Sequence, residues 1–363
     1  MKVDRQLLFI TAILVIFGFF IFTSASLGLL AREGARFSSV AFSQIFFGIL
    51  LGTAFLFAAM NIRYRVWKTL APFIFGLSII TTLLVFIPEL GFEANGARRW
   101  IHIFGFTFQP AEFLKVGFVM YLAAYFSTKR NKIDEYLYGL IPFTLMLGVV
   151  SAILLLQPDT GSMLVIASAG IAMYIASGAK IRDLVILLII SIALFSFLVS
   201  ERPYLQERIR TYINPGADLQ RSGYQLNQSL IAIGSGGIFG RGFGQSVQKF
   251  NYLPEPIGDS IFAVAAEEFG FIGGLILIFL FLMFAFRGLK IASRAPDYFS
   301  GLLIVGIVIL IISQSFINIG SMLGIFPLTG VPLLFISHGG TAMLFALGSV
   351  GIVLNISKYL KSS

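Results

Sequence analysis

Long apolar stretches recur along almost the whole of this 363-residue chain, and they limit its fold more than any other feature. A helix that crosses a bilayer needs about 20 mostly apolar residues, because the hydrocarbon core offers no partner for exposed peptide groups. About ten windows meet that requirement. They cover residues 7–29, 40–60, 70–87, 110–126, 137–156, 161–177, 184–200, 261–286, 302–325 and 342–356.

The composition supports an integral membrane protein. Hydrophobic residues make up 57% of the chain and charged residues only 12%, and the mean hydropathy is +0.91. A soluble fold with this balance would expose far too much apolar surface. The chain has no cysteine and only 2 histidines, which excludes disulfides and thiolate metal sites and leaves little for a histidine site. We predict an all-α membrane protein, with residues 1–363 forming a single polytopic domain.

The distribution of Lys and Arg predicts how the spans are oriented. Short basic segments next to spans stay in the cytoplasm. With the N-terminus inside, the basic clusters at 63–68, 129–132 and 287–294 all fall on the cytoplasmic side. Both termini are therefore predicted to be cytoplasmic, and most acidic residues to face outside. The net charge of +9 follows from these clusters, so we expect no nucleic-acid partner.

Three outer segments are more than connectors. Residues 89–109 mix charged, aromatic and Gly residues. Residues 201–260, between the seventh and eighth predicted helices, greatly exceed the roughly 12–15 residues of a structureless loop, so we expect a functional or partly helical segment. Residues 326–340 are rich in Pro and Gly and are predicted to dip back into the membrane against protein. The Gly-rich stretch 234–246 lacks phosphate-loop spacing, and two interpretations stay open: flexible turns, or backbone amides that approach a diphosphate.

Ionisable residues at the membrane edge are the candidates for chemistry. Glu112 and Lys115, three apart after Pro110, share one helical face, where they form either a structural salt bridge or part of a site. The neighbouring Arg98 and Arg99 suit a diphosphate or anionic lipid headgroups, because a guanidinium fork matches phosphate oxygens. Both interpretations place a lipid phosphate nearby.

Four further acids lie near predicted helix starts on the outer side. Asp159 follows Pro158 in a very short turn, where it can cap the next helix. Glu267 and Glu268 are interpreted as structural, with a basic partner in the bundle. Asp259 stands at a loop–helix junction after the flexible Gly258. It can either cap the helix or act as a general base at the mouth of an apolar cavity.

Several motifs, in their order along the chain, resemble the SEDS family (shape, elongation, division and sporulation), whose members include FtsW and RodA. They are GARRWI, FQPAEFLK, QPDTGS, GYQLNQSLIAIGSGG, SVQKFNYLPEPIGDSIFAVAAEE and FPLTGVPLLFISHGGT. The likeness runs from TSAS at 23–26 to the last span, and it slightly favours FtsW over RodA. The chain departs from the usual pattern at Ile257, Gly258 and Ser260 around the shared aspartate, and at His338, where the family usually has tyrosine.

The resemblance implies a peptidoglycan glycosyltransferase in the bacterial cytoplasmic membrane, with an extracytoplasmic active site. It would act in cell division or in elongation and cell shape. Lipid II and a polyprenyl-linked glycan strand would be its substrates, and a class B penicillin-binding protein and other divisome or elongasome proteins its partners. The family's essential aspartate matches Asp259, and the acid and base of its QPSEFxK motif match Glu112 and Lys115.

The implied transfer forms a β-1,4 bond with inversion, with Asp259 as the base. Lys115, Arg98, Arg99 or a divalent cation would stabilise the diphosphate that leaves. Mg²⁺ or Mn²⁺ is a candidate cofactor, with Asp259 as a candidate ligand, because hard cations bridge carboxylates and diphosphates. No organic cofactor is expected. The alternative is a lipid II flippase. Internal inverted repeats in the sequence would favour this alternative, and none is found. A small-solute transporter would place its ionisable residues near the membrane midplane instead.

Overall fold

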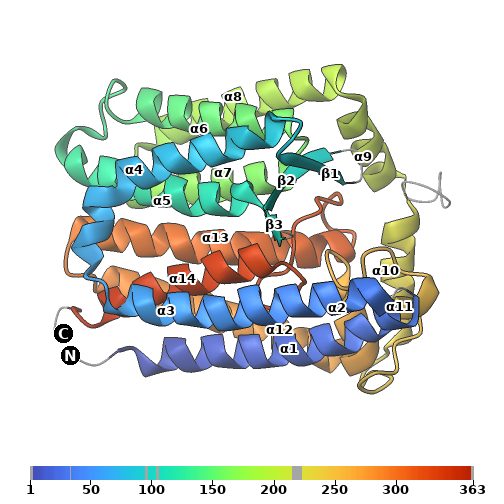
Figure 1. The fold of residues 1–363 in the computed structure, drawn as a ribbon. Coiled ribbons are helices and arrows are strands. Elements are labelled where there is room, and N and C mark those ends of the chain that lie inside the picture. Colours follow the sequence, from blue (N-terminus) through green and yellow to red (C-terminus); the bar gives the residue numbers. More distant parts are fainter. Residues whose placement is uncertain (1–2, 33, 95–96, 104–105, 215–222, 361–363) are drawn as a thin grey trace.

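The computed structural model describes residues 3–32, 34–94, 97–103, 106–214 and 223–360, which form a bundle of roughly parallel helices (Figure 1). Within these residues, 7 helices are long and apolar enough to cross a membrane by length and composition. They are α1 (Arg5–Arg32), the continuous run of α2 (Gly34–Phe42), the π-helix η1 (Ser43–Leu51) and α3 (Gly52–Asn61), then α4 (Tyr64–Leu83), α8 (Ile181–Glu201), α12 (Ile261–Ser293), α13 (Tyr298–Met322) and α14 (Gly340–Ser357).

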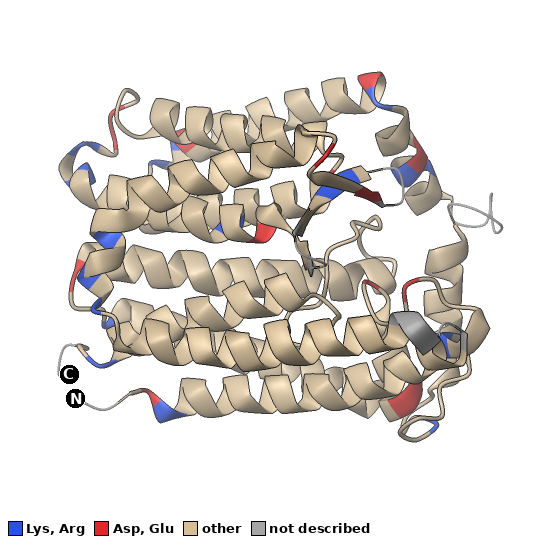
Figure 2. Ribbon diagram, viewed as in Figure 1, with Lys and Arg blue, Asp and Glu red and all other residues tan. Residues whose placement is uncertain are grey.

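Three further helices lie in the same bundle. They are α5 (Pro110–Thr128), α6 (Leu140–Leu156) and α7 (Thr160–Ala176), and with them every predicted span has a helical counterpart. The short 3₁₀ turns η2 (Leu84–Phe86) and η3 (Arg130–Lys132) follow α4 and α5. Both chain ends lie at one end of the bundle (Figure 1). Many Lys and Arg residues lie at that end (Figure 2), where the distribution of basic residues predicts the cytoplasmic side.

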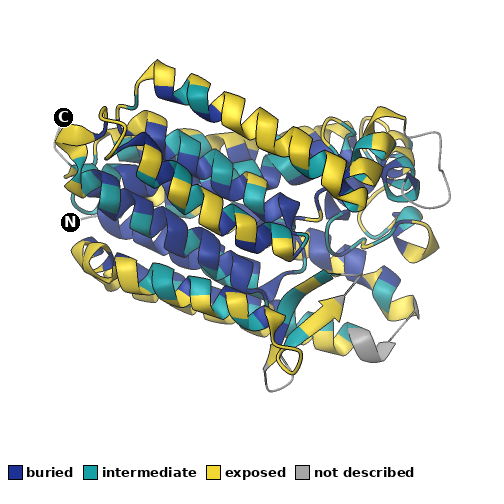
Figure 3. Ribbon diagram, turned by 90° about the horizontal axis from the view of Figure 1, so that it is seen from above, coloured by how far each residue is buried: buried dark blue, intermediate teal, exposed yellow. Residues whose placement is uncertain are grey.

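Helices α13 and α14 form the buried centre of the bundle. In the most apolar stretch of each helix, 67% of the residues are buried in α13 and 83% in α14. The corresponding share is 11% in α8, which lies at the periphery (Figure 3). Helix α13 contacts α5, α7, α12 and α14. A polar side chain on α13 therefore has protein partners rather than lipid, and such partners are needed because an unpaired polar group in an apolar interior is costly.

A small antiparallel sheet covers part of the outer end, and the sequence did not predict it. Its strands are β1 (Gly91–Ala94), β2 (Ala97–Ile103) and β3 (Phe106–Phe108), in the order β1-β2-β3. Phe92 pairs with Trp100, and Ile101 with Phe108. Aromatic and β-branched residues of this kind fit a half-buried pleated surface. The pairing of β1 with β2 shifts register beside Arg98 and Arg99, and such an irregularity breaks the strict alternation of side chains along a strand.

The long outer loop is partly helical, as predicted. It contains α9 (Pro203–Ile213), α10 (Tyr224–Ser235) and α11 (Gln248–Asn251). Its Gly-rich part packs against the first turns of α12, which is interrupted at Gly270 with φ 68°. A Cβ at Gly240 would come within 2.1 Å of the Glu268 carbonyl oxygen, so only glycine allows this approach.

The same packing bears on the diphosphate interpretation of residues 234–246, because it engages two of the backbone amides of this stretch. The backbone amides of Arg241 and Gly242 donate to the carbonyl oxygens of Glu267 and Glu268, each at 3.0 Å. These amides are therefore used by the protein itself. The stretch also does not line the cavities described below.

The segment 326–339 folds back among the helices, as predicted. It has no regular secondary structure, yet Val331, Leu333 and Ser337 are buried. Irregular backbone is tolerated at this depth only where protein surrounds it or where it lines a cavity. Both conditions hold here, since part of the segment forms a cavity wall.

Candidate active site

A cavity of about 520 Å³ lies at the outer end of the bundle, between the sheet, the long loop and segment 326–339. Its wall is assembled from parts of the chain that lie far apart in the sequence. The polar residues that line it include Arg99, Thr107, Gln109, Arg208, Gln225, Glu255, Asp259, Asn318, Thr329 and His338. The cavity therefore combines a carboxylate pair with two guanidinium groups.

Asp259 lies in this cavity and does not cap α12. The helix begins at Ile261 with Ser260 at the N-cap position. The capping interpretation of Asp259 was therefore wrong by one residue. Among the described residues, no hydrogen bond or ion pair is formed by the Asp259 carboxylate, which is free to meet a ligand.

The backbone around Asp259 is held at three consecutive carbonyl groups. Ile257, Gly258 and Asp259 each accept one hydrogen bond from another part of the fold. The donors are, in order, the backbone N–H of His338 at 2.7 Å, the Ser337 hydroxyl at 2.8 Å and the Asn318 side-chain amide at 2.8 Å. The segment that carries the carboxylate is thus fixed to segment 326–339 and to α13.

The surroundings of Asp259 make it a stronger base than an exposed aspartate. Burial raises its pKa to about 6, the Glu255 carboxylate acts in the same direction, and the Arg99 and Arg208 guanidinium groups oppose both. Burial and the neighbouring Arg99 also lower the pKa of Arg208. A base works best when its pKa lies near the working pH, and that is the position of Asp259.

The two arginines predicted to bind a diphosphate, Arg98 and Arg99, have different surroundings on β2. Arg99 lines the cavity, and its guanidinium donates to the carbonyl oxygens of Gln157, at 3.1 Å, and Pro158. Arg98 instead forms an exposed ion pair with Glu93 at 3.1 Å. Glu93 is the cross-strand partner of Arg98, and the β1–β2 register shifts beside this pair, at Arg99. Of the two arginines, only Arg99 lines the cavity.

Arg208 on α9 is a site residue that the sequence did not reveal. It lines the cavity of Asp259 and also an adjoining cavity of about 500 Å³, and Arg99 lines both as well. Its guanidinium donates to the Thr160 hydroxyl at 2.8 Å. Several arginines occur in the long loop, and no spacing rule distinguishes Arg208 from the others. Only the folded position of α9 does so.

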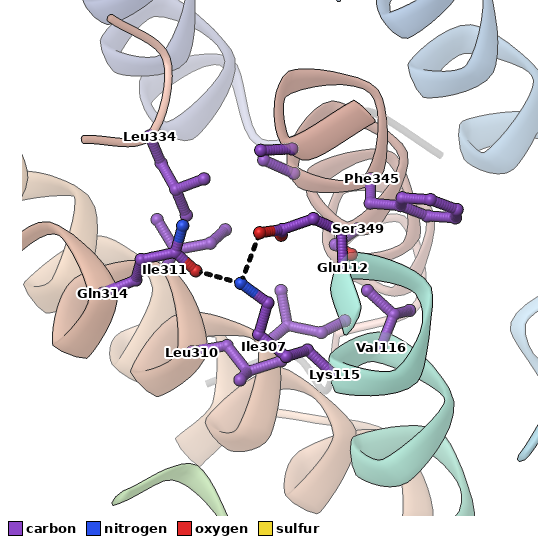
Figure 4. A pocket seen from close by; sticks show the side chains of 12 residues that line it. Glu112, Lys115, Val116, Ile307, Leu310, Ile311, Gln314, Leu334, Phe345 and Ser349 are labelled. Atoms are coloured by element: carbon purple, nitrogen blue, oxygen red, sulfur yellow. Dashed lines mark hydrogen bonds and ion pairs between the residues drawn. The ribbon is translucent and has the colours of Figure 1, made fainter. Parts of the chain in front are cut away.

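Glu112 and Lys115 form the predicted salt bridge, at 2.7 Å, and both side chains are almost fully buried. Figure 4 shows that the Lys115 ammonium also points at Gln314 of α13, to whose side-chain oxygen it donates at 2.5 Å. The pair lines a small, mostly apolar pocket of about 30 Å³ between α5, α13 and α14. This pocket is separate from the cavity of Asp259, and Lys115 does not line that cavity.

The remaining acids hold the outer end together. Asp159 caps α7 by accepting from the Ser162 backbone N–H at 3.1 Å. Glu267 accepts from the Ser246 hydroxyl at 2.6 Å and lies 3.4 Å from Arg241. Glu268 pairs with the fully buried Lys249 at 2.7 Å and accepts from Ser24 of α1. Glu267 and Glu268 thus fasten the Gly-rich stretch to α12, as their structural interpretation predicts.

The carboxylates that line the cavity could hold a cation only together with phosphate groups of a bound substrate. Among the described residues, no group of three metal-ligating side chains occurs. Asp259 and Glu255 nevertheless both line the same cavity. Mg²⁺ is commonly held by one or two carboxylates together with substrate phosphates, and these two residues fit that pattern.

Comparison with known proteins gives the chain a clear set of relatives. Residues 5–362 match the family model FTSW_RODA_SPOVE, described as "Cell cycle protein". The chain is 41% identical over 312 residues to stage V sporulation protein E of Bacillus subtilis, covering 85% of this chain and 84% of that protein. It is 36% identical over 374 residues to the probable peptidoglycan glycosyltransferase FtsW of the same organism, covering 99% and 92%.

Solved structures extend the likeness to the fold. One, described as "Structural coordination of polymerization and crosslinking by a peptidoglycan synthase complex", superposes with a TM-score of 0.81 at 26% identity, covering 100% of both chains. A crystal structure of an aspartate-to-alanine mutant of the rod shape determining protein RodA from Thermus thermophilus gives 0.71 at 26% identity, also over 100% of both chains. The slight preference for FtsW over RodA agrees with the names of the sequence relatives.

Proposed function

The chain belongs to the FtsW/RodA/SpoVE family of cell cycle proteins, and we propose on that premise that it polymerises lipid II as a peptidoglycan glycosyltransferase. The reaction takes place at the outer face of the bacterial cytoplasmic membrane, in division or a related process of wall synthesis. The observation that carries this proposal is the outer cavity, which Asp259 lines together with Arg99 and Arg208.

The proposed transfer needs a base and a stabilised leaving group. The growing strand is linked through an α-diphosphate to a polyprenyl chain, and the acceptor is the sugar 4-hydroxyl of lipid II. Asp259 takes the hydroxyl proton as the oxygen attacks the anomeric carbon, a β-1,4 bond forms with inversion, and polyprenyl diphosphate leaves. Arg99 and Arg208 stabilise the charge that develops on the diphosphate. The adjoining cavity, which both arginines also line, leaves room for a second substrate headgroup.

Substitution of the arginines tests this assignment. We expect Arg208→Ala or Arg99→Ala to lower kcat/KM for lipid II at least tenfold, because a guanidinium is lost beside the diphosphate. Arg98→Ala provides the matched control on the same strand, with near-normal kinetics, because its ion pair with Glu93 is exposed. Equal losses for Arg98→Ala and Arg99→Ala in initial-rate measurements would contradict the assignment.

The pH dependence follows from the raised pKa of Asp259. Only the ionised carboxylate can accept a proton, so activity is retained above the folded-state pKa of about 6 and lost as the pH falls through it. We expect the logarithm of kcat/KM to fall with a slope of one per pH unit below that point. Glu255→Gln removes a negative neighbour, so the fall of kcat/KM on the acid side, the acid limb of the pH profile, should move to lower pH. A limb near the ordinary aspartate value of about 4 in the unsubstituted protein would contradict this account.

A divalent cation is a further part of the proposal. Asp259 and Glu255 would hold it together with the substrate diphosphate, and it would supply additional charge neutralisation there. We expect EDTA to slow polymerisation in detergent and added Mg²⁺ or Mn²⁺ to restore it. A polymerisation rate that is insensitive to EDTA over a range of concentrations would show that the reaction needs no divalent cation.

The proposed partner is a class B penicillin-binding protein, a transpeptidase that crosslinks the strands. Support comes from the likeness to the chain of a peptidoglycan synthase complex. The direct test of the activity is to incubate the purified protein in detergent with labelled lipid II, alone and with a matched transpeptidase, and to resolve the glycan products on a gel. Long strands support the proposal, and persistent absence of polymer in both conditions contradicts it.

A further inference from the structure

Two amides on the central helix connect the buried salt bridge to the segment that carries Asp259. Gln314 and Asn318 lie four residues apart on α13, so they share one face of the helix. Both side chains are about 1% exposed. A buried primary amide is expected to have hydrogen-bond partners, and the partners of these two show what they hold.

Gln314 connects α5 to segment 326–339. Its side-chain oxygen accepts from the Lys115 ammonium at 2.5 Å, and its side-chain nitrogen donates to the Pro332 carbonyl oxygen at 3.2 Å. Lys115 in turn is paired with Glu112 at 2.7 Å. Because an oxygen that accepts from an ammonium leaves only the NH₂ group to face Pro332, the charge fixes which way the amide points.

Asn318 connects the same segment to Asp259. Its side-chain nitrogen donates to the Val331 carbonyl oxygen at 2.8 Å and to the Asp259 carbonyl oxygen at 2.8 Å. A primary amide has two N–H bonds, and both are used here. Pro332, the partner of Gln314, directly follows Val331, so the two amides hold adjacent peptide groups.

We propose that Gln314 and Asn318 are positioning residues through which the Glu112–Lys115 pair fixes the backbone of Asp259 in the outer cavity. This inference rests on the proposed glycosyltransferase function. It gives Lys115 an indirect role: the ammonium orients Gln314, Gln314 and Asn318 hold residues 331–332, and Asn318 holds Asp259. A base must be placed to within a fraction of an ångström for efficient proton transfer, so loss of this connection lowers turnover more than it lowers substrate binding.

Substitutions that preserve the approximate size of the side chain remove individual hydrogen bonds of Gln314 and Asn318. Gln314→Glu keeps an oxygen for Lys115 but loses the donor to Pro332. Asn318→Leu keeps the approximate volume but loses both donors. Ser315→Ala is the matched control, because Ser315 is buried on the same helix and, within the described part of the chain, its hydroxyl bonds only to the Ile311 carbonyl oxygen of that helix.

The test measures lipid II polymerisation per folded molecule in detergent, as kcat and KM separately. We expect Asn318→Leu and Gln314→Glu to lower kcat at least tenfold with less than a threefold change in KM. Ser315→Ala should match the unsubstituted protein in both respects.

The outcomes separate the inference from the proposed function. If the unsubstituted protein makes no polymer, both fail. If it makes polymer and the folded fraction of Gln314→Glu or Asn318→Leu has the kcat and KM of Ser315→Ala, the positioning role alone is overturned. Should Asn318→Leu not fold, Gln314→Glu decides the question by the same criteria.

Discussion

Replacing Asp259 by asparagine is expected to lower the rate of lipid II polymerisation by at least about 100-fold, the lower range for losing a general base. Asparagine has nearly the same shape but cannot take up the hydroxyl proton. Because the Asp259 side chain forms no hydrogen bond with the described residues and does not cap α12, the substitution removes no structural contact. The protein should therefore reach the membrane and unfold at an unchanged temperature.

The control for this substitution is an acid at the opposite end of the bundle. Asp134→Asn changes an exposed carboxylate paired with Lys180, and it should polymerise lipid II at a normal rate. Near-normal activity in Asp259→Asn would show that Asp259 is not the base. An unfolded Asp259→Asn protein would show that its role is structural.

Loss of Lys115 or Glu112 alone is expected to have the largest effect on stability. Removing one member of a buried pair leaves an uncompensated charge, and losses of about 3–5 kcal/mol are typical. Lys115→Met and Glu112→Gln should each lower the unfolding free energy in detergent by an amount of this order. The double variant should lose clearly less than the sum, since neither charge is then left alone.

The exposed pair Arg98–Glu93 is the matched comparison for this cycle. An exposed ion pair contributes only about 0–1 kcal/mol, so its single and double variants should all lie close to the unsubstituted protein. Strictly additive losses at Glu112 and Lys115 would contradict a coupled pair, whatever the size of the single effects.

The sequence was sufficient for the spans because one physical rule governs them. Every lipid-exposed peptide group must be paired, so a span needs a long apolar helix, and composition alone reveals where such helices lie. The helical spacing of Glu112 and Lys115 likewise placed them on one face of α5, where they pair. The partly helical outer loop and the inward fold of residues 326–339 also followed from local composition.

Contacts between distant segments could not be predicted in this way. Arg98 and Arg99 look equivalent in sequence, and only the unpredicted sheet separates them, since Arg98 pairs with Glu93 across the strands and Arg99 lines the cavity. Arg208, Gln314 and Asn318 acquire their roles from elements far away in the chain, and no local pattern distinguishes them. The helix boundary at Ser260 decided whether Asp259 caps or reacts, and sequence patterns do not resolve boundaries that finely.

The alternative of a lipid II flippase uses the same cavity and arginines, but it needs alternating access instead of a base. The cavity that holds Arg99, Arg208 and Asp259 lies at the outer end of the bundle, which favours chemistry on substrate that is already in the outer leaflet. Inverting transfer from the outer face is therefore the central claim.

The most direct measurement of that claim uses sealed vesicles in which the protein's outer end faces the medium and labelled lipid II is supplied only to the outer leaflet, with the matched transpeptidase present. The account predicts glycan strands from the unsubstituted protein and none from Asp259→Asn. Absence of strands from the unsubstituted protein, together with lipid II translocation that persists in Asp259→Ala, would contradict it and support a transporter.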